Sequence, residues 1–528
     1  MRRSSHSAGV LVPLPLVLAG VLLLPGCAGE PGASPGDSGV LDVVLAGGRV
    51  IDPESGLDAV RNVGLRGGEI VAITTESLDA RLAESGERID VSGLVVAPGF
   101  IDLHAHGQSP RANEFQVRDG VTTALELEWG YLDLPSWYAA REGKALVNYG
   151  ASVAHGMVRT LVLPDNLERR EQIRSRVRDA LRSDGLLRAM QGLLSGGFYT
   201  KLPPENYELL FDELRRGLEE GALGIGMAHE YYPGANHEEI YRVFELAAEV
   251  EAPIYTHVRR GELSAIQEVV ANATATGAAL HIVHVNSKSL GQIDTVLALI
   301  EGARERGVDV STEAYPYTAG STSIQASIFD EGWQQRLNLD YGDIQWQETS
   351  ERLTEETFDM LRAEGGTVII HMMKPEWIET AMRSPFVMIA SDGMPYAPGA
   401  HPRSAGTFSR VLGYYVREQG VLDLPTALRK MTLMPAQRLE GIAPQMARKG
   451  RVQVGMDADL TLFDPDSIID TATFESDLSF SEGVQYVLVG GTFVVREGET
   501  VPDTFPGQLI HGRFATAEAC PGCAAAGG

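Results

Sequence analysis

Cysteine is nearly absent from this chain of 528 residues. Its three cysteines are Cys27, Cys520 and Cys523, so the long stretch between the first and the second has none. This excludes a disulfide framework as the basis of the fold. The terminal CPGC sequence has no second pair of ligands beside it, and it predicts a local disulfide or no role at all.

Positive charge is also scarce. Lys and Arg number 44 against 71 Asp and Glu, which gives a net charge of −27. Such a balance excludes a nucleic-acid-binding protein and a broad electrostatic contact with anionic lipid. Hydrophobic residues make up 44% of the chain and charged residues 22%, as in ordinary globular proteins.

A long apolar run occurs near the N-terminus, VLVPLPLVLAGVLLL. It is short for a membrane span, is interrupted by Pro13 and Pro15, and follows the basic pair Arg2 and Arg3. Residues 1–26 are therefore predicted to be a signal peptide. The sequence LLPGC resembles a bacterial lipoprotein cleavage site, which would make Cys27 the lipidated first residue. The alternative is an ordinary secretory signal with an incidental cysteine.

The remaining chain predicts an exported protein held at the cell envelope by a lipid anchor. Residues 27–40 are rich in Gly, Ser and Pro and indicate a flexible tether. β-rich runs punctuated by glycine pairs fill residues 41–97 and 452–512, which favours one small β-sandwich built from both ends of the chain. The last residues, 513–528, are expected to form a flexible tail.

Residues 98–451 alternate short apolar runs with amphipathic stretches such as PPENYELLFDELRRGLEEG. This alternation predicts an α/β fold, a (β/α)₈ TIM barrel. A long connection at about 317–385 is expected to be an insertion or a lid.

Polar side chains recur where the predicted strands end, which is where a barrel carries its active site. The first stretch, GFIDLHAHG, places His104 and His106 one residue apart, and residues i and i+2 of a strand share a face. The later predicted strand ends contribute Glu126, Glu128, His155, His257, His284 and Asp392.

Two of these strand ends require a choice. His281 and His284 lie three residues apart and face opposite sides of a strand, so we take His284 as inward and His281 as structural. Glu126 and Glu128 share a face, and Glu128 is nearer the strand end, which favours it as a ligand. Imidazoles and carboxylates around an open position suit one or two Zn²⁺ ions and a water nucleophile, with Asp392 as the proton carrier.

The motifs VVAPGFIDLHAHG, GALGIGMAHEYYPGA, HPRSAGTFSRVLGYYVRE and LRKMTLMPAQRL resemble, in order, those of the amidohydrolase superfamily and within it the N-acyl-D-amino-acid deacylases. The resemblance covers about residues 41–510. It implies a metal-dependent hydrolase that deacylates N-acyl-D-amino acids, acyl-D-glutamate included. It also implies metal ligands at His104, His106, His257, His284 and Asp392, with Asp392 as general acid/base.

For the substrate, the resemblance implies contacts from His155 and from Arg403, with Tyr317 and Arg259 as weaker candidates. The chain departs from the family in two places. ELEWG has no cysteine where the family has a cysteine ligand, so a carboxylate must bridge two ions or the site must hold one. The bridging lysine of other amidohydrolases is also absent from GALGIGMAHE, which strengthens Glu128. HVNSK has Asn286 where the family has a substrate-binding lysine, with Lys288 two residues later.

Two further functions remain open at this point. One is a dipeptidase or prolidase, or a cyclic amidase of the hydantoinase or dihydroorotase type. The other is a lipoprotein that binds a small molecule or a metal without turnover. The sequence sets neither the oligomeric state nor the substrate side chain.

Overall fold

Eight parallel strands form the central sheet of the computed structural model, which describes residues 39–181, 197–520 and 523. The predicted leader and Cys27 lie outside the described residues. The sheet order is β16-β12-β11-β10-β9-β8-β7-β6. Its strands are β6 (Phe100–Asp102), β7 (Val121–Tyr131), β8 (Asn148–Ala154), β9 (Ile225–Ala228), β10 (Ile254–His257), β11 (Leu280–Ile282), β12 (Val310–Ala314) and β16 (Val387–Ile389).

The sheet curls into a barrel. Just beyond β6 and β16 the N–H of His106 donates to the carbonyl oxygen of Gly393 at 2.8 Å, and Ala105 forms a parallel bridge with Gly393. These contacts join the first strand to the last. The predicted TIM barrel is confirmed, with all eight predicted strands present in the predicted order.

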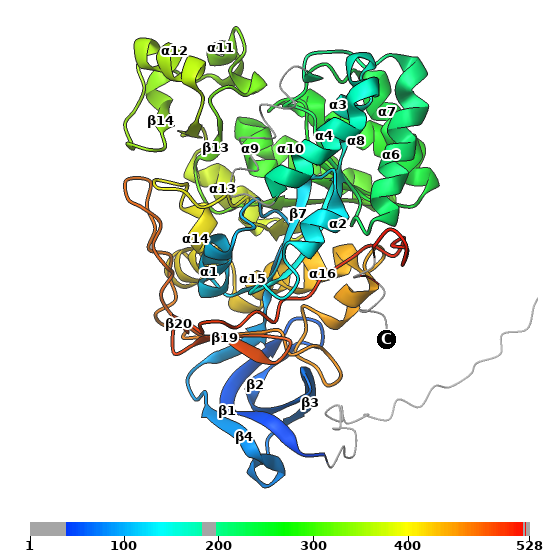
Figure 1. The fold of residues 1–528 in the computed structure, drawn as a ribbon. Coiled ribbons are helices and arrows are strands. Elements are labelled where there is room, and N and C mark those ends of the chain that lie inside the picture. The colour runs from blue at the N-terminus through cyan, green and yellow to red at the C-terminus, as the bar shows by residue number, and fades with distance from the viewer. Residues whose placement is uncertain (1–38, 182–196, 521–522, 524–528) are drawn as a thin grey trace, which may run out of the picture. The chain divides into compact units, whose positions relative to one another are not determined.

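Helices cover the outside of the barrel (Figure 1). In α6 the side chains of Leu210, Leu214 and Leu218 recur every four residues and are buried, as the amphipathic pattern requires. The helices are α1 (Pro110–Arg118), α2 (Leu134–Ala139), α3 (His155–Leu161), α4 (Arg170–Leu181), α6 (Tyr207–Glu219), α7 (His237–Glu249), α8 (Leu263–Thr276), α9 (Val285–Ser289), α10 (Ile293–Glu305), α13 (Pro375–Arg383), α14 (Arg403–Arg410), α15 (Leu424–Met431) and α16 (Leu433–Leu439).

A second sheet has nine strands and combines both ends of the described chain. Strand β17 pairs antiparallel with β5, so the C-terminal strands continue the N-terminal ones. Its strands are β1 (Leu41–Asp52), β2 (Leu57–Arg66), β3 (Glu69–Thr74), β4 (Leu82–Asp90), β5 (Val95–Pro98), β17 (Leu460–Phe463), β18 (Val484–Val489), β19 (Thr492–Arg496) and β20 (Glu499–Thr500). Buried residues from both halves, including Val63, Val96 and Leu460, share one apolar core.

Between β12 and β16 the chain forms a small unit of its own. Strands β13 (Gly320–Ser323), β15 (Thr367–Ile370) and β14 (Ile344–Trp346) make an antiparallel sheet in that order, with α11 (Trp333–Leu337) and α12 (Glu355–Glu364) beside it. Phe329, Trp333 and Phe358 pack together in its core. Figure 1 shows this unit and the nine-stranded sheet at opposite ends of the barrel.

The predicted flexible tail is wrong for residues 513–520. Their backbone is hydrogen-bonded to the barrel, with the N–H of Arg513 donating to Ile442 and that of Thr516 to Glu219. The Cys520 side chain is buried and forms a disulfide with Cys523. Phe514 packs against the barrel core, so apolar burial holds a segment whose composition indicated a loose end. Among the described residues, no helix combines the length and apolar character needed to cross a membrane.

Candidate metal centre

Six predicted side chains meet at the carboxyl ends of the barrel strands. Their ligand atoms form two groups within which every atom lies within 4.8 Å of the others, and Glu128 belongs to both. The first group is His104, His106, Glu128 and Asp392; the second is Glu128, His257 and His284.

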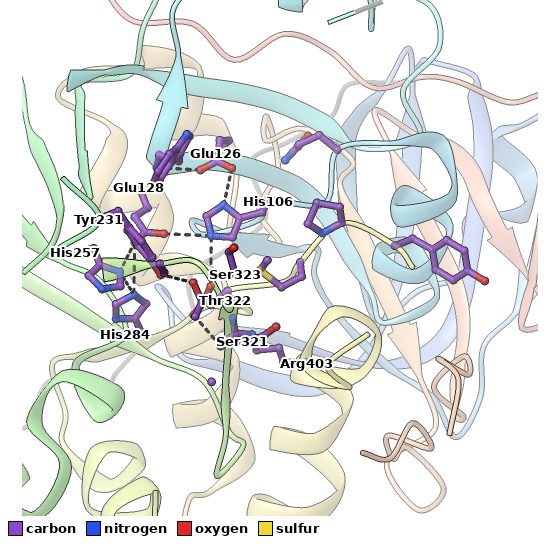
Figure 2. Close-up of a pocket in the computed structure, with 18 of the residues that line it drawn as sticks. His106, Glu126, Glu128, Tyr231, His257, His284, Ser321, Thr322, Ser323 and Arg403 are labelled. Carbon is purple, nitrogen blue, oxygen red and sulfur yellow. Dashed lines mark hydrogen bonds and ion pairs between the residues drawn. The ribbon is translucent and has the colours of Figure 1, made fainter. Parts of the chain in front are cut away.

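The Glu128 carboxylate lies between the two groups (Figure 2). Its Oε2 is 2.8 Å from His104 Nε2 and 3.1 Å from His106 Nε2. Its Oε1 is 2.5 Å from His257 Nδ1 and 3.6 Å from His284 Nε2. One oxygen therefore faces each pair of imidazoles, which is the arrangement of a carboxylate that bridges two ions. Asp392 Oδ1 lies 3.4 Å from both His104 Nε2 and His106 Nε2, on the first side only.

Three of the imidazoles have a carboxylate behind them. His104 Nδ1 is 2.6 Å from Glu313 Oε1, His106 Nδ1 is 2.7 Å from Glu126 Oε2, and His257 Nε2 is 2.7 Å from Glu230 Oε2. Such contacts fix the orientation and the tautomer of an imidazole that faces a metal with its other nitrogen. Glu126 thus orients His106, whereas Glu128 occupies the position between the two groups.

The charge balance of the cluster favours a bound cation. Burial lowers the pKa of His104, but the charges of Asp392 and Glu128 raise it well above its ordinary value. Burial raises the pKa of Glu128, yet His104 and His257 hold it well below the ordinary range. Both shifts show that the buried carboxylates stabilise a positive charge placed among them. A divalent metal ion supplies such a charge. Imidazole nitrogens and carboxylate oxygens are also the donors that Zn²⁺ prefers, so these residues fit one or two zinc ions.

The cluster opens into a cavity of about 1180 Å³. Two buried cations line it beside the cluster. Arg403 Nη1 is 2.8 Å from Asp392 Oδ2, and its guanidinium lies over the Tyr315 ring at 4.6 Å. Lys288 Nζ contacts Glu230, the carboxylate that orients His257. Burial raises the pKa of Glu230, but Lys288 and the His257 imidazole lower it to about 2.

Four residues predicted to bind substrate do not line the cavity. His155 begins α3 directly after β8 and is buried, with Nδ1 3.1 Å from Tyr232 Oη and Nε2 3.3 Å from Glu239. Arg259 is 3.1 Å from Glu268 and donates to the carbonyl oxygen of Ala235. The Tyr317 hydroxyl donates to Asp470 at 3.1 Å. All three side chains have protein partners instead.

The fourth is Asn286, whose amide donates to the carbonyl oxygen of Tyr315 at 3.0 Å and is buried. A strand that continued through His284 would place Asn286, two residues later, on the same face. Strand β11 ends at Ile282, His284 has a left-handed backbone with φ 35°, and residues 285–289 form a helical turn. One helical turn separates His284 from Lys288, so Lys288 lines the cavity in place of Asn286. His281 is structural as predicted, with Ser311 and Glu313 as its partners.

Sequence reasoning missed two carboxylates, Glu230 and Glu313. Glu313 lies in a fully buried strand, β12, where a charged residue is itself a signal of a buried partner. Glu230 follows the end of β9 and is the last residue of the GALGIGMAHE sequence, in which the lysine is absent. Both act on imidazoles that are distant in the sequence, and no spacing pattern connects such pairs.

The comparisons with known proteins agree with this geometry. Residues 87–495 match the model of the amidohydrolase family. A D-aminoacylase of Alcaligenes xylosoxydans xylosoxydans is 31% identical over 88% of this chain and 96% of its own length. An N-acyl-D-glutamate deacylase of the same organism is 29% identical over 89% and 96%.

The crystal structure of N-acyl-D-glutamate deacylase from Bordetella bronchiseptica, complexed with zinc and a phosphonate inhibitor, superimposes with a TM-score of 0.74. It is 26% identical, and the match covers 89% of this chain and 100% of that one. With its barrel, its histidine and carboxylate cluster and this extended similarity, the chain belongs to the amidohydrolase family.

Proposed function

We propose that this protein is a zinc-dependent deacylase of N-acyl-D-amino acids, which hydrolyses the linear amide to a carboxylate and a free D-amino acid. The observation that carries the proposal is the position of Glu128 between two imidazole pairs, next to a cavity with two buried cations. Relatives with these activities match nearly the whole chain. The cyclic amidases and a non-catalytic binding protein are not favoured by these relatives.

In this proposal His104, His106 and Asp392 would hold one ion, His257 and His284 would hold the other, and Glu128 would serve both groups. Zinc, when bound, would supply a Lewis acid and lower the pKa of a water nucleophile. The Asp392 carboxylate would accept a proton at Oδ1 from the attacking water and deliver it to the nitrogen of the leaving amine. Arg403 pairs with Oδ2, which leaves Oδ1 facing His104 and His106.

The substrate's α-carboxylate is proposed to bind between Lys288 and Arg403. A guanidinium can pair with a carboxylate through two nitrogens. Nη1 of Arg403 already contacts Asp392, whereas Nε is buried without a hydrogen-bond partner in the described residues. The cation–π contact with Tyr315 fixes the plane of the guanidinium. This contact orients the amide relative to the cluster.

The test is zinc content and turnover of the purified protein on N-acetyl-D- and N-acetyl-L-amino acids, with dihydroorotate and Xaa-Pro dipeptides as comparison substrates. Release of the D-amino acid that is lost with a chelator and restored by zinc supports the proposal. We expect Asp392→Asn to lower kcat by a factor of about 10³ or more. Turnover of dihydroorotate or Xaa-Pro alone, or bound zinc without any turnover, refutes it.

We also propose that the protein is exported and anchored through lipid on Cys27, which rests on the sequence LLPGC and on nothing in the described structure. The test is fractionation of cells that produce the native chain or Cys27→Ala. A native chain in the membrane fraction and a variant released from it support the anchor. Equal distribution of both proteins contradicts it.

A further inference from the structure

Strand β13 is the edge of the three-stranded sheet, and all four of its residues, Gly320, Ser321, Thr322 and Ser323, line the cavity. It pairs with β15 on one side only. An edge strand carries backbone N–H and C=O groups without partners in its own sheet, and such groups can pair with another extended chain.

The register shows which backbone groups of β13 face β15 and which point away from it. The N–H of Ile324 donates to Gly366, so Thr322 and Gly320, two and four residues earlier, form the hydrogen-bonded pairs with β15. On the other side of β15 the carbonyl oxygen of Thr367 accepts from Gln347, which confirms the alternation. The N–H and C=O of Ser321 therefore point away from β15. Ser323 has the same orientation, and its C=O accepts from Ala326.

This edge lies beside the metal centre (Figure 2). The Thr322 hydroxyl donates to Tyr231 Oη at 3.3 Å, and the Tyr231 ring centroid is 4.9 Å from that of His257. The Ser321 hydroxyl is buried and has no hydrogen-bond partner in the described residues. The residues of β13 and most of those of the ligand cluster thus line one cavity.

The lining of the cavity also suits a chain longer than an acetyl group. Uncharged polar side chains from the same segment, Gln325 and Ser327 among them, line one part of it, and the rings of Trp129 and Tyr231 line another. Their ring centroids are 5.5 Å apart in an edge-to-face arrangement. Neutral hydrogen-bonding groups and aromatic faces match the backbone and side chains of a peptide.

We propose that the acyl part of the natural substrate is a peptide, which extends along β13 as an added strand and hydrogen-bonds to the backbone of Ser321. The protein then removes a C-terminal D-amino acid from a peptide: water oxygen bonds to the peptide carbonyl carbon, the C–N bond breaks, and the amine leaves with a proton. This inference rests on the proposed deacylase function and names its substrate class.

The first test compares kcat/KM of the native protein for N-acetyl-D-alanine, N-acetyl-L-Ala-D-Ala and N-acetyl-L-Ala-L-Ala-D-Ala. Each added peptide unit can offer one hydrogen bond to this edge, because its N–H and C=O point to opposite sides of an extended chain. Two added units therefore predict a gain of about 10-fold or more from the acetyl substrate to the longest peptidyl substrate. The same peptides with the L-alanine N–H methylated should lose that gain. A flat or falling series, or a gain that survives methylation, overturns the proposal while the deacylase function stands. No release from any of these D-substrates contradicts both.

The second test uses the protein backbone. Ser321→Pro removes an N–H that β15 does not use, whereas Ser321→Ala keeps it and removes only the hydroxyl. We expect the ratio of peptidyl to acetyl kcat/KM to fall toward one in the proline variant and to remain well above one in the alanine variant. Circular dichroism and zinc content report whether each variant is folded. A folded proline variant with the native ratio contradicts pairing at β13.

Discussion

Arg403 and Asp392 form a buried ion pair beside the metal centre, with Nη1 2.8 Å from Oδ2. Arg403 is 2% exposed and Asp392 is 7% exposed. If Arg403 is replaced by an uncharged residue, the Asp392 carboxylate therefore loses its partner at a buried position. The pair connects the group proposed to bind the substrate carboxylate with the group proposed to carry the proton.

Arg403→Ala is therefore expected to lower kcat/KM for N-acetyl-D-leucine by a factor of about 10² or more, because it removes a carboxylate partner and leaves Asp392 unpaired. Arg403→Lys keeps the charge without the two-nitrogen fork and should recover part of the loss. Steady-state kinetics check this. If Arg403 contributes only to folding, the uncharged amide of the same substrate loses as much rate as the acid does.

Glu128 should determine how many zinc ions bind. Because one oxygen faces each imidazole pair, Glu128→Gln weakens both positions, and we expect fewer than half the native zinc equivalents after dialysis. Glu126→Gln is the matched comparison two residues away, since it removes only the partner of His106. Its expected effect is a loss of zinc affinity of about 10- to 100-fold. Equal zinc content in Glu128→Gln and the native protein, by elemental analysis, contradicts a bridging carboxylate.

N-acyl-D-glutamate should be a poorer substrate than N-acyl-D-leucine, by a factor of about 10 or more in kcat/KM. The cations near the centre are already paired, Lys288 with Glu230 and Arg403 with Asp392, and one substrate carboxylate occupies both. Farther away, Arg111 pairs with Glu114. Arg141 donates to the carbonyl oxygens of Trp137 and Gln108. Lys144, an exposed cation of the cavity lining, then remains as a partner for a second carboxylate. A preference for glutamate that Lys144→Met abolishes contradicts the prediction.

The C-terminal segment should contribute to stability. Deletion of residues 513–528 removes the packing of Phe514 and the hydrogen bonds of Arg513 and Thr516, and we expect a loss of about 2–4 kcal/mol in the free energy of unfolding. Cys520→Ser with Cys523→Ser should cost less, because the loop closed by the disulfide is short. Calorimetric melting of the three proteins checks both statements. An unchanged Tm after the deletion shows that residues 513–528 do not stabilise the barrel.

Lys430 should make stability dependent on pH in the alkaline range. Burial lowers its pKa to about 7, and Nζ donates to the carbonyl oxygen of Val387 at 2.7 Å, at the start of β16. An unfolded lysine titrates near 10.4, so between these values the unfolded state binds more protons and stability rises with pH. Relative to that of Lys430→Met, the free energy of unfolding of the native protein should increase by about 1 kcal/mol per pH unit between pH 7.5 and 9.5. Denaturant unfolding at several pH values measures this difference. If the free energy of unfolding of the two proteins changes equally with pH in this range, the prediction is contradicted.

The barrel and most of its metal centre could be predicted from the amino-acid sequence. Apolar runs that alternate with amphipathic stretches leave few packing arrangements open. The six ligand candidates lie near the carboxyl ends of strands: Glu128 within the last residues of β7, and the others at or just beyond a strand end, namely His104, His106, His257, His284 and Asp392. Since parallel strands bring their carboxyl ends to one edge, position along the chain was sufficient to bring these six together.

Tertiary structure alone decided the rest. Whether Asn286 or Lys288 reaches the cavity depended on where β11 ends and a helical turn begins. The contacts of Glu313 with His104 and of Glu230 with His257 join distant parts of the chain, and so does the packing of Phe514 and Cys520. Burial and charge compensation select such partners only when the chain is folded, because both depend on distances in space that no sequence interval records.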